Sequence, residues 1–156
     1  MNNQQPSMMV QQLDALLTNE TDQVANMANA SALLYSSMDN VNWAGFYRYL
    51  PDQNELILGP FQGKVACVHI KNGSGVCGTA FQQNKIQRIR DVHEFPGHIA
   101  CDADSQSEIV IPINLPNGIR LGVLDIDSPI VNRFSESDEL ELAQFVSTFV
   151  KHLTIA

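Results

Sequence analysis

The strongest constraint on the fold is a hairpin pattern in the last third of the chain. An apolar segment at residues 108–115 is followed by Pro116-Asn117-Gly118 and then by a second apolar segment at residues 119–127. Asn-Gly is a preferred sequence for the tight turns that connect antiparallel strands. The two segments therefore predict neighbouring antiparallel strands.

A second hairpin is predicted nearer the amino terminus. Residues 42–50 are aromatic and alternating, and residues 55–60 return after a polar turn. Because side chains alternate between the two faces of a strand, Trp43 and Tyr47 share one face and Phe46 lies on the other.

The remaining segments complete an α+β pattern. Helical spacing of apolar residues, glycine-rich entries and a capping-box motif indicate helices, and short β-branched runs indicate strands. The combination predicts a central, mostly antiparallel sheet with packed helices. We expect helices at residues 7–18, 22–38, 75–84 and from about 135 onward, and further strands at 65–70 and 86–89.

Size and charge narrow the function classes. A chain of 156 residues suffices for a single domain with a real core. Its formal net charge of −8 argues against a nucleic-acid partner, because phosphates require clustered Lys and Arg. No apolar run reaches the roughly 18 residues of a membrane span, and the amino terminus lacks signal-peptide features. We therefore expect a cytoplasmic protein.

The cysteines are the first candidates for chemistry. Cys67, Cys77 and Cys101 form no C-x-x-C pair, so zinc-ribbon and thioredoxin-type signals are absent. A zinc site built from these three residues and His98 remains open on ligand count. Cys67 lies between apolar neighbours and is also compatible with a core position, whereas Cys101 lies in a polar loop that is typical of a reactive thiol.

Two features favour thiolates. Cys77 lies near the start of the helix predicted at 75–84, where the helix dipole favours negative charge. A cationic His98 would stabilise a thiolate at Cys101, although a histidine in such a loop is also compatible with simple solvation.

Acidic residues near the predicted hairpin are the second candidates. Asp125 and Asp127 are two residues apart on one strand and so share a face. Paired carboxylates repel one another and commonly bind a cation, an ammonium group or a shared proton. The alternatives are a turn aspartate at 127 and a solvated edge residue at Glu108.

Taken together, these residues closely resemble the free methionine-(R)-sulfoxide reductases, a family of stand-alone GAF-domain enzymes. The resemblance covers about residues 10–150, with all three cysteines in register. It is carried by the segments at residues 42–47, 58–63, 75–78, 91–93, 95–102, 105–109 and 122–128.

The resemblance implies a fold and an activity. The fold is a single GAF domain over residues 1–156, with its core at about 10–153 and six antiparallel strands. Helices pack on one face and a loop-covered ligand pocket lies on the other. The activity is reduction of free L-methionine-(R)-sulfoxide, with thioredoxin as the reductant and no bound cofactor or metal. A homodimer is also implied.

The resemblance further implies roles for individual residues. Cys101 matches the nucleophile, and Cys67 and Cys77 match the two thiols that could resolve its sulfenic acid, with Cys67 the expected first partner. The remaining matches are the pocket carboxylates Glu108, Asp125 and Asp127, and the aromatic wall Trp43 and Tyr47.

Two other classes stay open at this point. The first is a non-catalytic GAF sensor that binds a small ligand and reports redox state, although such sensors usually accompany an output domain for which this chain has no room. The second is a zinc-stabilised interaction module. Turnover would exclude the sensor, and metal analysis would test the zinc module.

Overall fold

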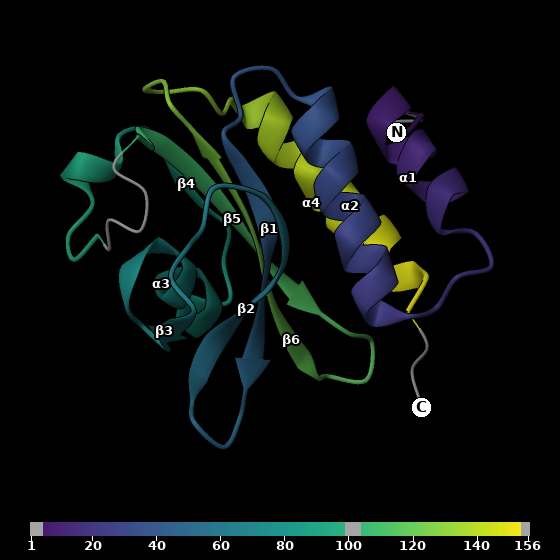
Figure 1. The fold of residues 1–156 in the computed structure, drawn as a ribbon, viewed down its shortest axis with the longest axis horizontal. Coiled ribbons are helices and arrows are strands. Elements are labelled where there is room, and N and C mark those ends of the chain that lie inside the picture. Colours follow the sequence, from purple (N-terminus) through teal and green to yellow (C-terminus); the bar gives the residue numbers. More distant parts are fainter. Residues whose placement is uncertain (1–4, 99–103, 154–156) are drawn as a thin grey trace.

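The computed structural model describes residues 5–98 and 104–153 (Figure 1). They fold into an α+β domain with one central sheet. The helices are α1 (Met8–Leu17), α2 (Gln23–Ser37), α3 (Gly75–Gln83), α4 (Glu136–Lys151) and a 3-10 turn, η1 (Val92–Glu94). The strands are β1 (Trp43–Leu50), β2 (Glu55–Gly63), β3 (His69–Lys71), β4 (Gln87–Ile89), β5 (Ser107–Asn114) and β6 (Arg120–Ser128).

All six strands belong to one antiparallel sheet with the order β3-β2-β1-β6-β5-β4. The two predicted hairpins are confirmed as β1-β2 and β5-β6. They join through β1 and β6, which place Gly45 opposite Asp125 and Trp43 opposite Asp127. Residues that are far apart in sequence thus become direct neighbours at the centre of the sheet.

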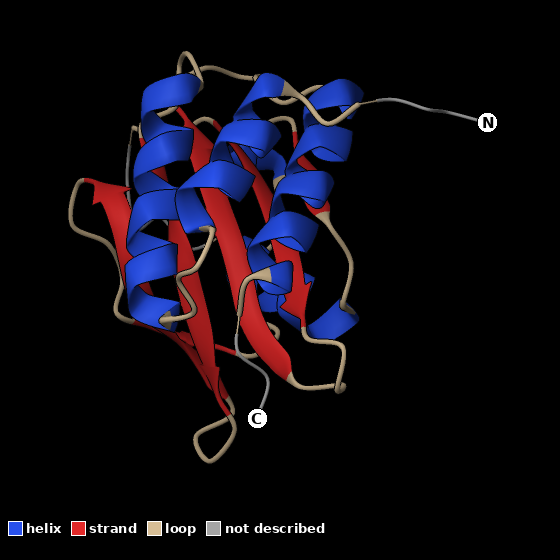
Figure 2. Ribbon diagram, turned by 90° about the vertical axis from the view of Figure 1, so that its right-hand side faces the viewer, coloured by secondary structure: helices blue, strands red, loops and turns tan. Residues whose placement is uncertain are grey.

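Helices α1, α2 and α4 cover one face of the sheet (Figure 2). Their apolar sides and the facing strand residues form the main core. This core includes Met9, Leu13, Leu34, Phe46, Ile109, Leu124, Phe145 and Phe149.

Helix α3 lies on the other side of the sheet from these three helices (Figure 1). A second, smaller apolar cluster separates α3 from the strands. It includes Trp43, Tyr47, Leu56, Val76, Phe81, Val110 and Val123. Trp43 and Tyr47 therefore lie on the opposite face from Phe46, as the period of two predicts.

The helix starts follow their sequence signals. The side chain of Asp22 accepts a hydrogen bond from the Ala25 amide at the start of α2. At α4, Ser135 and Asp138 form the predicted capping box, in which each side chain accepts the other residue's amide. These bonds satisfy backbone donors that a helix leaves unpaired at its amino terminus.

The predicted strand at 65–70 is wrong over most of its length. Only its end belongs to a strand, as part of β3, and residues 64–68 form an irregular segment. The reason lies in β1: the Trp43 indole donates to the Lys64 carbonyl at 3.1 Å, and the Tyr47 hydroxyl donates to the Cys67 carbonyl at 2.9 Å. Side chains from β1 thus take acceptors that a sheet ladder would otherwise use.

A glycine permits the close approach of β1 and β6. Gly122 on β6 has a φ of 153° and faces Arg48 on β1. A Cβ atom at this position would collide with the carbonyl oxygen of Tyr47. Gly122 therefore lets the strand that carries Asp125 pack directly beside the strand that carries the aromatic residues.

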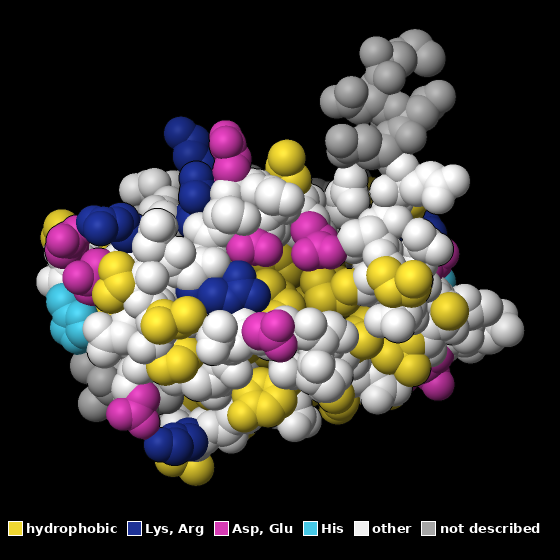
Figure 3. All heavy atoms as spheres, turned by 90° about the horizontal axis from the view of Figure 1, so that it is seen from above, with side chains coloured by type: hydrophobic (Ala, Val, Ile, Leu, Met, Phe, Trp, Pro, Cys, Tyr) yellow, Lys and Arg dark blue, Asp and Glu magenta, His cyan; other side chains and the backbone are white. Residues whose placement is uncertain are grey.

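The surface mixes hydrophobic groups with charges of both signs. Figure 3 shows one end of the molecule, where acidic and basic side chains surround a group of hydrophobic side chains. Among the helices of residues 5–98 and 104–153, none combines the length and apolar character needed to cross a membrane.

Candidate active site

A pocket lies on the face of the sheet that α3 covers. Its cavity volume is about 50 Å³, and it is partly open to solvent. Strands β1, β5 and β6, helix α3, residues 65–66, His98 and Ser105 contribute to its lining. The predicted site residues that line it are Trp43, Tyr47, Cys77, Glu108, Asp125 and Asp127.

Strand periodicity brings the acidic residues together. Asp125 and Asp127 both point to the pocket from β6, two residues apart. Glu108 on β5 lies opposite Asp127 in the strand register, so a third carboxylate joins the pair from the neighbouring strand. Glu108 is buried, so the alternative of a solvated edge residue is wrong.

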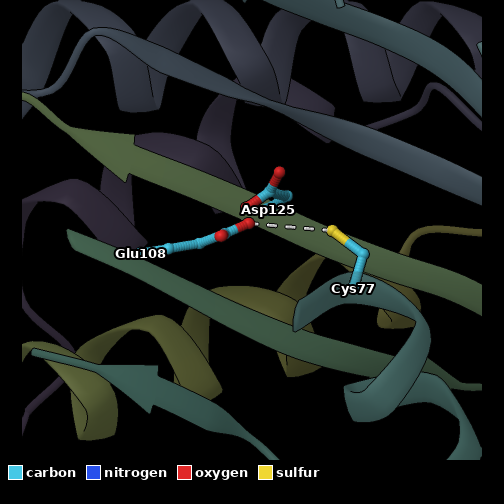
Figure 4. Close-up of side chains that lie close together, drawn as sticks. All are labelled: Cys77, Glu108 and Asp125. Carbon is cyan, nitrogen blue, oxygen red and sulfur yellow. Dashed lines mark hydrogen bonds between the residues drawn. The ribbon is translucent and has the colours of Figure 1, made fainter. Parts of the chain in front are cut away.

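A tight cluster forms where β5, β6 and α3 meet (Figure 4). Ligand atoms of Cys77, Glu108 and Asp125 all lie within 4.8 Å of one another. The Cys77 thiol donates to the Glu108 carboxyl oxygen Oε2 over 3.9 Å. The exposed fractions of these residues are 4%, 7% and 5%, so the cluster is shielded from bulk water. We call these three residues the acid–thiol cluster.

The acid–thiol cluster favours protonated carboxyl groups. Burial raises the pKa of Glu108 well above its usual range, and the nearby Asp125 raises it further. Burial also raises the pKa of Asp125, and the neighbouring Asp127 adds to the effect. A carboxyl group that keeps its proton at neutral pH can act as an acid toward a bound molecule.

The thiol of Cys77 is also neutral. Burial raises its pKa well above the ordinary value, and the carboxyl groups of Asp125 and Glu108 raise it further. The expectation that the start of α3 favours a thiolate is therefore wrong. Burial and two nearby acids outweigh a helix dipole, whose effect at a terminus is about 0.3–1 kcal/mol at exposed sites.

The aromatic wall is a stack on one face of β1 and β2. Trp43 stacks on Phe61 with ring centroids 5.1 Å apart and on Tyr47 at 5.9 Å. Burial raises the pKa of the Tyr47 hydroxyl, so that it stays protonated and donates to the Cys67 carbonyl. The wall thus has an apolar surface and also holds the segment at residues 64–67.

The other predicted thiol positions are only partly described. Cys67 is half-buried and takes part in a disulfide bond, whereas Cys77 is a free thiol. Cys101, the predicted nucleophile, lies outside the described residues, and its role stays a prediction. His98 lines the pocket, and burial lowers its pKa, so a neutral imidazole is favoured.

The zinc site considered from the sequence would need the thiolates of all three cysteines together with His98. This set is not available in this state, because Cys67 is in a disulfide and offers no thiolate.

Ser105 lines the pocket with a buried hydroxyl that has no hydrogen-bond partner among the described residues. Ser105 was not among the predicted site residues, and its signal in the sequence is its position in the polar stretch before β5.

The sequence and the fold of this chain are similar to those of known proteins. Residues 12–152 match the GAF domain family. The free methionine-R-sulfoxide reductase of Escherichia coli is 55% identical over 140 residues, which cover 90% of this chain and 83% of that protein.

Two solved structures extend the comparison. The reduced form of the fRMsr of Staphylococcus aureus has a TM-score of 0.89 and 49% identity, and the match covers 94% of this chain and 93% of that chain. The free methionine-R-sulfoxide reductase from Neisseria meningitidis, solved with its substrate, has a TM-score of 0.88 and 40% identity over 92% of this chain and 85% of that chain.

The family match and the similar proteins agree on one family for this chain. The similarity extends over nearly the whole chain and over most of each relative, so it concerns the complete domain. The chain belongs to the GAF-domain family and, within it, to the free methionine-R-sulfoxide reductases, which are oxidoreductases.

Proposed function

We propose that this protein reduces free methionine-(R)-sulfoxide to methionine in the pocket between the sheet and α3. The observation that carries the proposal is the acid–thiol cluster, which provides protonated carboxyl groups beside the aromatic wall. The names of the relatives, including a structure solved with its substrate, support the same reaction.

The first step uses Cys101 as the nucleophile. Its thiolate attacks the sulfoxide sulfur, and the oxygen is transferred to the cysteine as a sulfenic acid while methionine leaves. A proton must reach the oxygen as the sulfur–oxygen bond breaks. Glu108 is the proposed donor, because burial and Asp125 keep its carboxyl group protonated.

The second step forms a disulfide. A second thiol attacks the sulfenic acid of Cys101, and water leaves. We assign this role to Cys67, which is half-buried, follows the pocket-lining Ala66 and already takes part in a disulfide. Cys77 is less suited, because a buried neutral thiol is a poor nucleophile. Its place in an onward exchange stays a prediction.

The remaining acidic residues have a binding role in this proposal. Asp127 is half-buried at the pocket edge, beside Asp125 in the strand. A free amino acid carries an ammonium group, which a carboxylate at this position would attract. A peptide-bound sulfoxide lacks this ammonium group and would be rejected.

Thioredoxin is the proposed reductant of the disulfide, and the cytoplasm is the proposed location. Both rest on the family resemblance, as does a homodimer. Light scattering should then give a particle mass of twice the 17.2 kDa chain mass. A monomeric mass at micromolar concentration would contradict the dimer.

The decisive experiment is a coupled assay that follows NADPH oxidation through thioredoxin reductase and thioredoxin. We expect turnover with the free R-sulfoxide and little with the free S-sulfoxide or a peptide-bound sulfoxide. Cys101→Ser should abolish turnover, and near-normal turnover in that variant would overturn the nucleophile assignment. A sensor would bind the sulfoxide without consuming reductant, and the relatives named as reductases do not favour that alternative.

A further inference from the structure

The acid–thiol cluster has the donor atoms of a divalent metal site. Cys77 offers a sulfur, and Glu108 and Asp125 each offer a carboxylate oxygen. All three atoms lie within 4.8 Å of one another, and each comes from a different element of the fold. The site is therefore formed by tertiary structure and does not depend on one loop or one helix.

The spacing suits a small four-coordinate ion. Zinc binds sulfur at about 2.3 Å and carboxylate oxygen at about 2.0–2.2 Å, so two such ligands are about 3.5 Å apart in a tetrahedron. The Cys77 sulfur and the Glu108 oxygen are 3.9 Å apart, which requires only a small adjustment. A thiolate ligand favours zinc and cadmium over magnesium and calcium, which prefer oxygen donors alone.

An unsatisfied oxygen points to a missing ligand. Asp125 is 5% exposed, and its Oδ1 atom has no hydrogen-bond partner among the described residues. Buried carboxylate oxygens of this kind normally have a donor or a cation. Among the described residues that line the pocket there is no lysine or arginine.

The adjoining space fits an ion and its water. The cavity measures about 50 Å³, whereas a single water molecule needs about 10–15 Å³ of such volume. A tetrahedral ion held by three protein ligands keeps one open position, which a water or a substrate atom can occupy.

We propose that this pocket binds one zinc-type divalent cation through Cys77, Glu108 and Asp125, with the fourth position open to the cavity. Binding displaces the proton of the Cys77 thiol and any proton on the two carboxyl groups, so the cation competes with protons. If the proposed reductase function holds, the cation also competes with substrate for Glu108 and Asp125.

The test is a cadmium titration of the full chain prepared without reductant, in which Cys67 is in its disulfide and Cys77 is a free thiol. We expect one Cd²⁺ per chain and the ultraviolet charge-transfer absorption of a cadmium thiolate. Cys77→Ser should remove this absorption. Glu108→Gln and Asp125→Asn should keep it but weaken binding by at least about tenfold.

Controls make the outcome unambiguous. Glu94→Gln removes an exposed carboxylate in η1 and should bind Cd²⁺ as the parent chain does. Circular dichroism verifies that each variant is folded. Absence of the charge-transfer band in the parent chain, or an undiminished band in Cys77→Ser, would overturn the site. Unchanged affinity in both carboxyl variants would do the same.

The titration is independent of turnover. A protein that reduces methionine sulfoxide but binds no Cd²⁺ would overturn the metal site and leave the reductase proposal in place. A protein that binds Cd²⁺ through Cys77 but fails in the coupled assay would support the metal site and overturn the reductase proposal.

Discussion

Asp125 is a buried carboxyl group in an environment that is unfavourable for its charged form. It is nearly inaccessible to solvent, one of its oxygens has no partner among the described residues, and another acid lies two residues away. Such a group destabilises the fold when it is ionised. Retaining it suggests a role in binding or chemistry, because a structural position would be better served by a neutral side chain.

The first prediction concerns the stability of Asp125→Asn. The pKa of Asp125 is raised in the folded chain, so between the ordinary and the raised pKa the native state binds more protons than the unfolded state. The free energy of unfolding therefore falls as pH rises through this window. Asparagine does not titrate, so the stability of the variant relative to the parent chain should rise as the pH increases through this window.

Urea unfolding at a series of pH values measures this difference. Asp52→Asn, in the exposed turn between β1 and β2, provides the control and should show a flat difference from the parent. A variant whose stability relative to the parent falls with rising pH would contradict the assignment of a raised pKa to Asp125.

The second prediction concerns the acid in the proposed reaction. Glu108→Gln keeps the shape of the side chain but cannot give up a proton, so kcat should fall by about 100-fold or more. In the parent chain, kcat should decline as pH rises through the raised pKa of Glu108. The coupled assay measures both effects, and a variant that kept the parent's rate and pH profile would assign the acid to another residue.

The sequence predicts some of this residue-scale picture. The shared face of Asp125 and Asp127 follows from their spacing on a strand. The burial of Glu108 cannot be predicted in this way, because a glutamate at the start of a strand has no local signal that α3 will cover it. The state of Cys77 was predicted wrongly for the same reason, since its acidic neighbours come from β5 and β6.

At the scale of elements, β1 supports the segment that carries Cys67. Trp43 and Tyr47 each hold one backbone carbonyl of residues 64–67 through a side-chain donor. Two hydrogen bonds from a central strand fix this irregular segment against the sheet. The position of Cys67 therefore depends on aromatic side chains as well as on its own backbone.

The third prediction follows from the Tyr47 hydroxyl. Tyr47→Phe keeps the ring but removes the donor to the Cys67 carbonyl. Loss of one such bond costs about 1 kcal/mol, so formation of the disulfide should slow about fivefold. In a single turnover, the loss of thiols should slow more than the release of methionine.

Tyr49→Phe is the matched control, because its hydroxyl donates to the side chain of Asn54, in the turn that follows β1. It should leave both rates near those of the parent chain. Equal slowing of both steps in Tyr47→Phe would indicate that the hydroxyl affects the whole pocket and not the Cys67 segment.

The fourth prediction concerns the start of α4. Ser135→Ala removes the side-chain oxygen that accepts the Asp138 amide, so the free energy of unfolding should fall by about 1 kcal/mol. Ser137→Ala, an exposed position in the first turn, should change it far less. Chemical denaturation of the three proteins measures the difference, and equal losses in the two variants would contradict a specific capping role.

Elements with local signals were predicted well. The two hairpins, the capping box and the helices depend on turn residues and periodicity, which lie within a few residues of each other. The segment at 65–68 was predicted wrongly because its apolar residues have the pattern of a strand. Its conformation is set by donors on β1, about twenty residues earlier in the sequence.

At the scale of the whole molecule, one sheet supports two apolar clusters. The main core lies under α1, α2 and α4, and the smaller cluster lies under α3. Strands β1 and β6 contribute to both. The strand order β3-β2-β1-β6-β5-β4 has no local signal in the sequence, and the resemblance to a known family implied six antiparallel strands without their order.

The fifth prediction is that the two clusters unfold together. Trp43 is the single tryptophan and lies in the pocket-side cluster, whereas far-ultraviolet circular dichroism reports mainly on the helices of the other face. Because β1 and β6 belong to both clusters, thermal transitions followed by fluorescence and by dichroism should coincide. Separate midpoints would show that the α3 side opens independently of the main core.

The alternation of side chains along β1 has a practical consequence for engineering. Phe46 belongs to the main core, whereas Trp43 and Tyr47, on the opposite side of the same strand, line the pocket. Substitutions on the pocket side of β1 therefore change the lining of the pocket, while the packing of Phe46 in the main core is kept. One face of β1 is needed for folding, and the other face can be changed to alter the chemistry of the pocket.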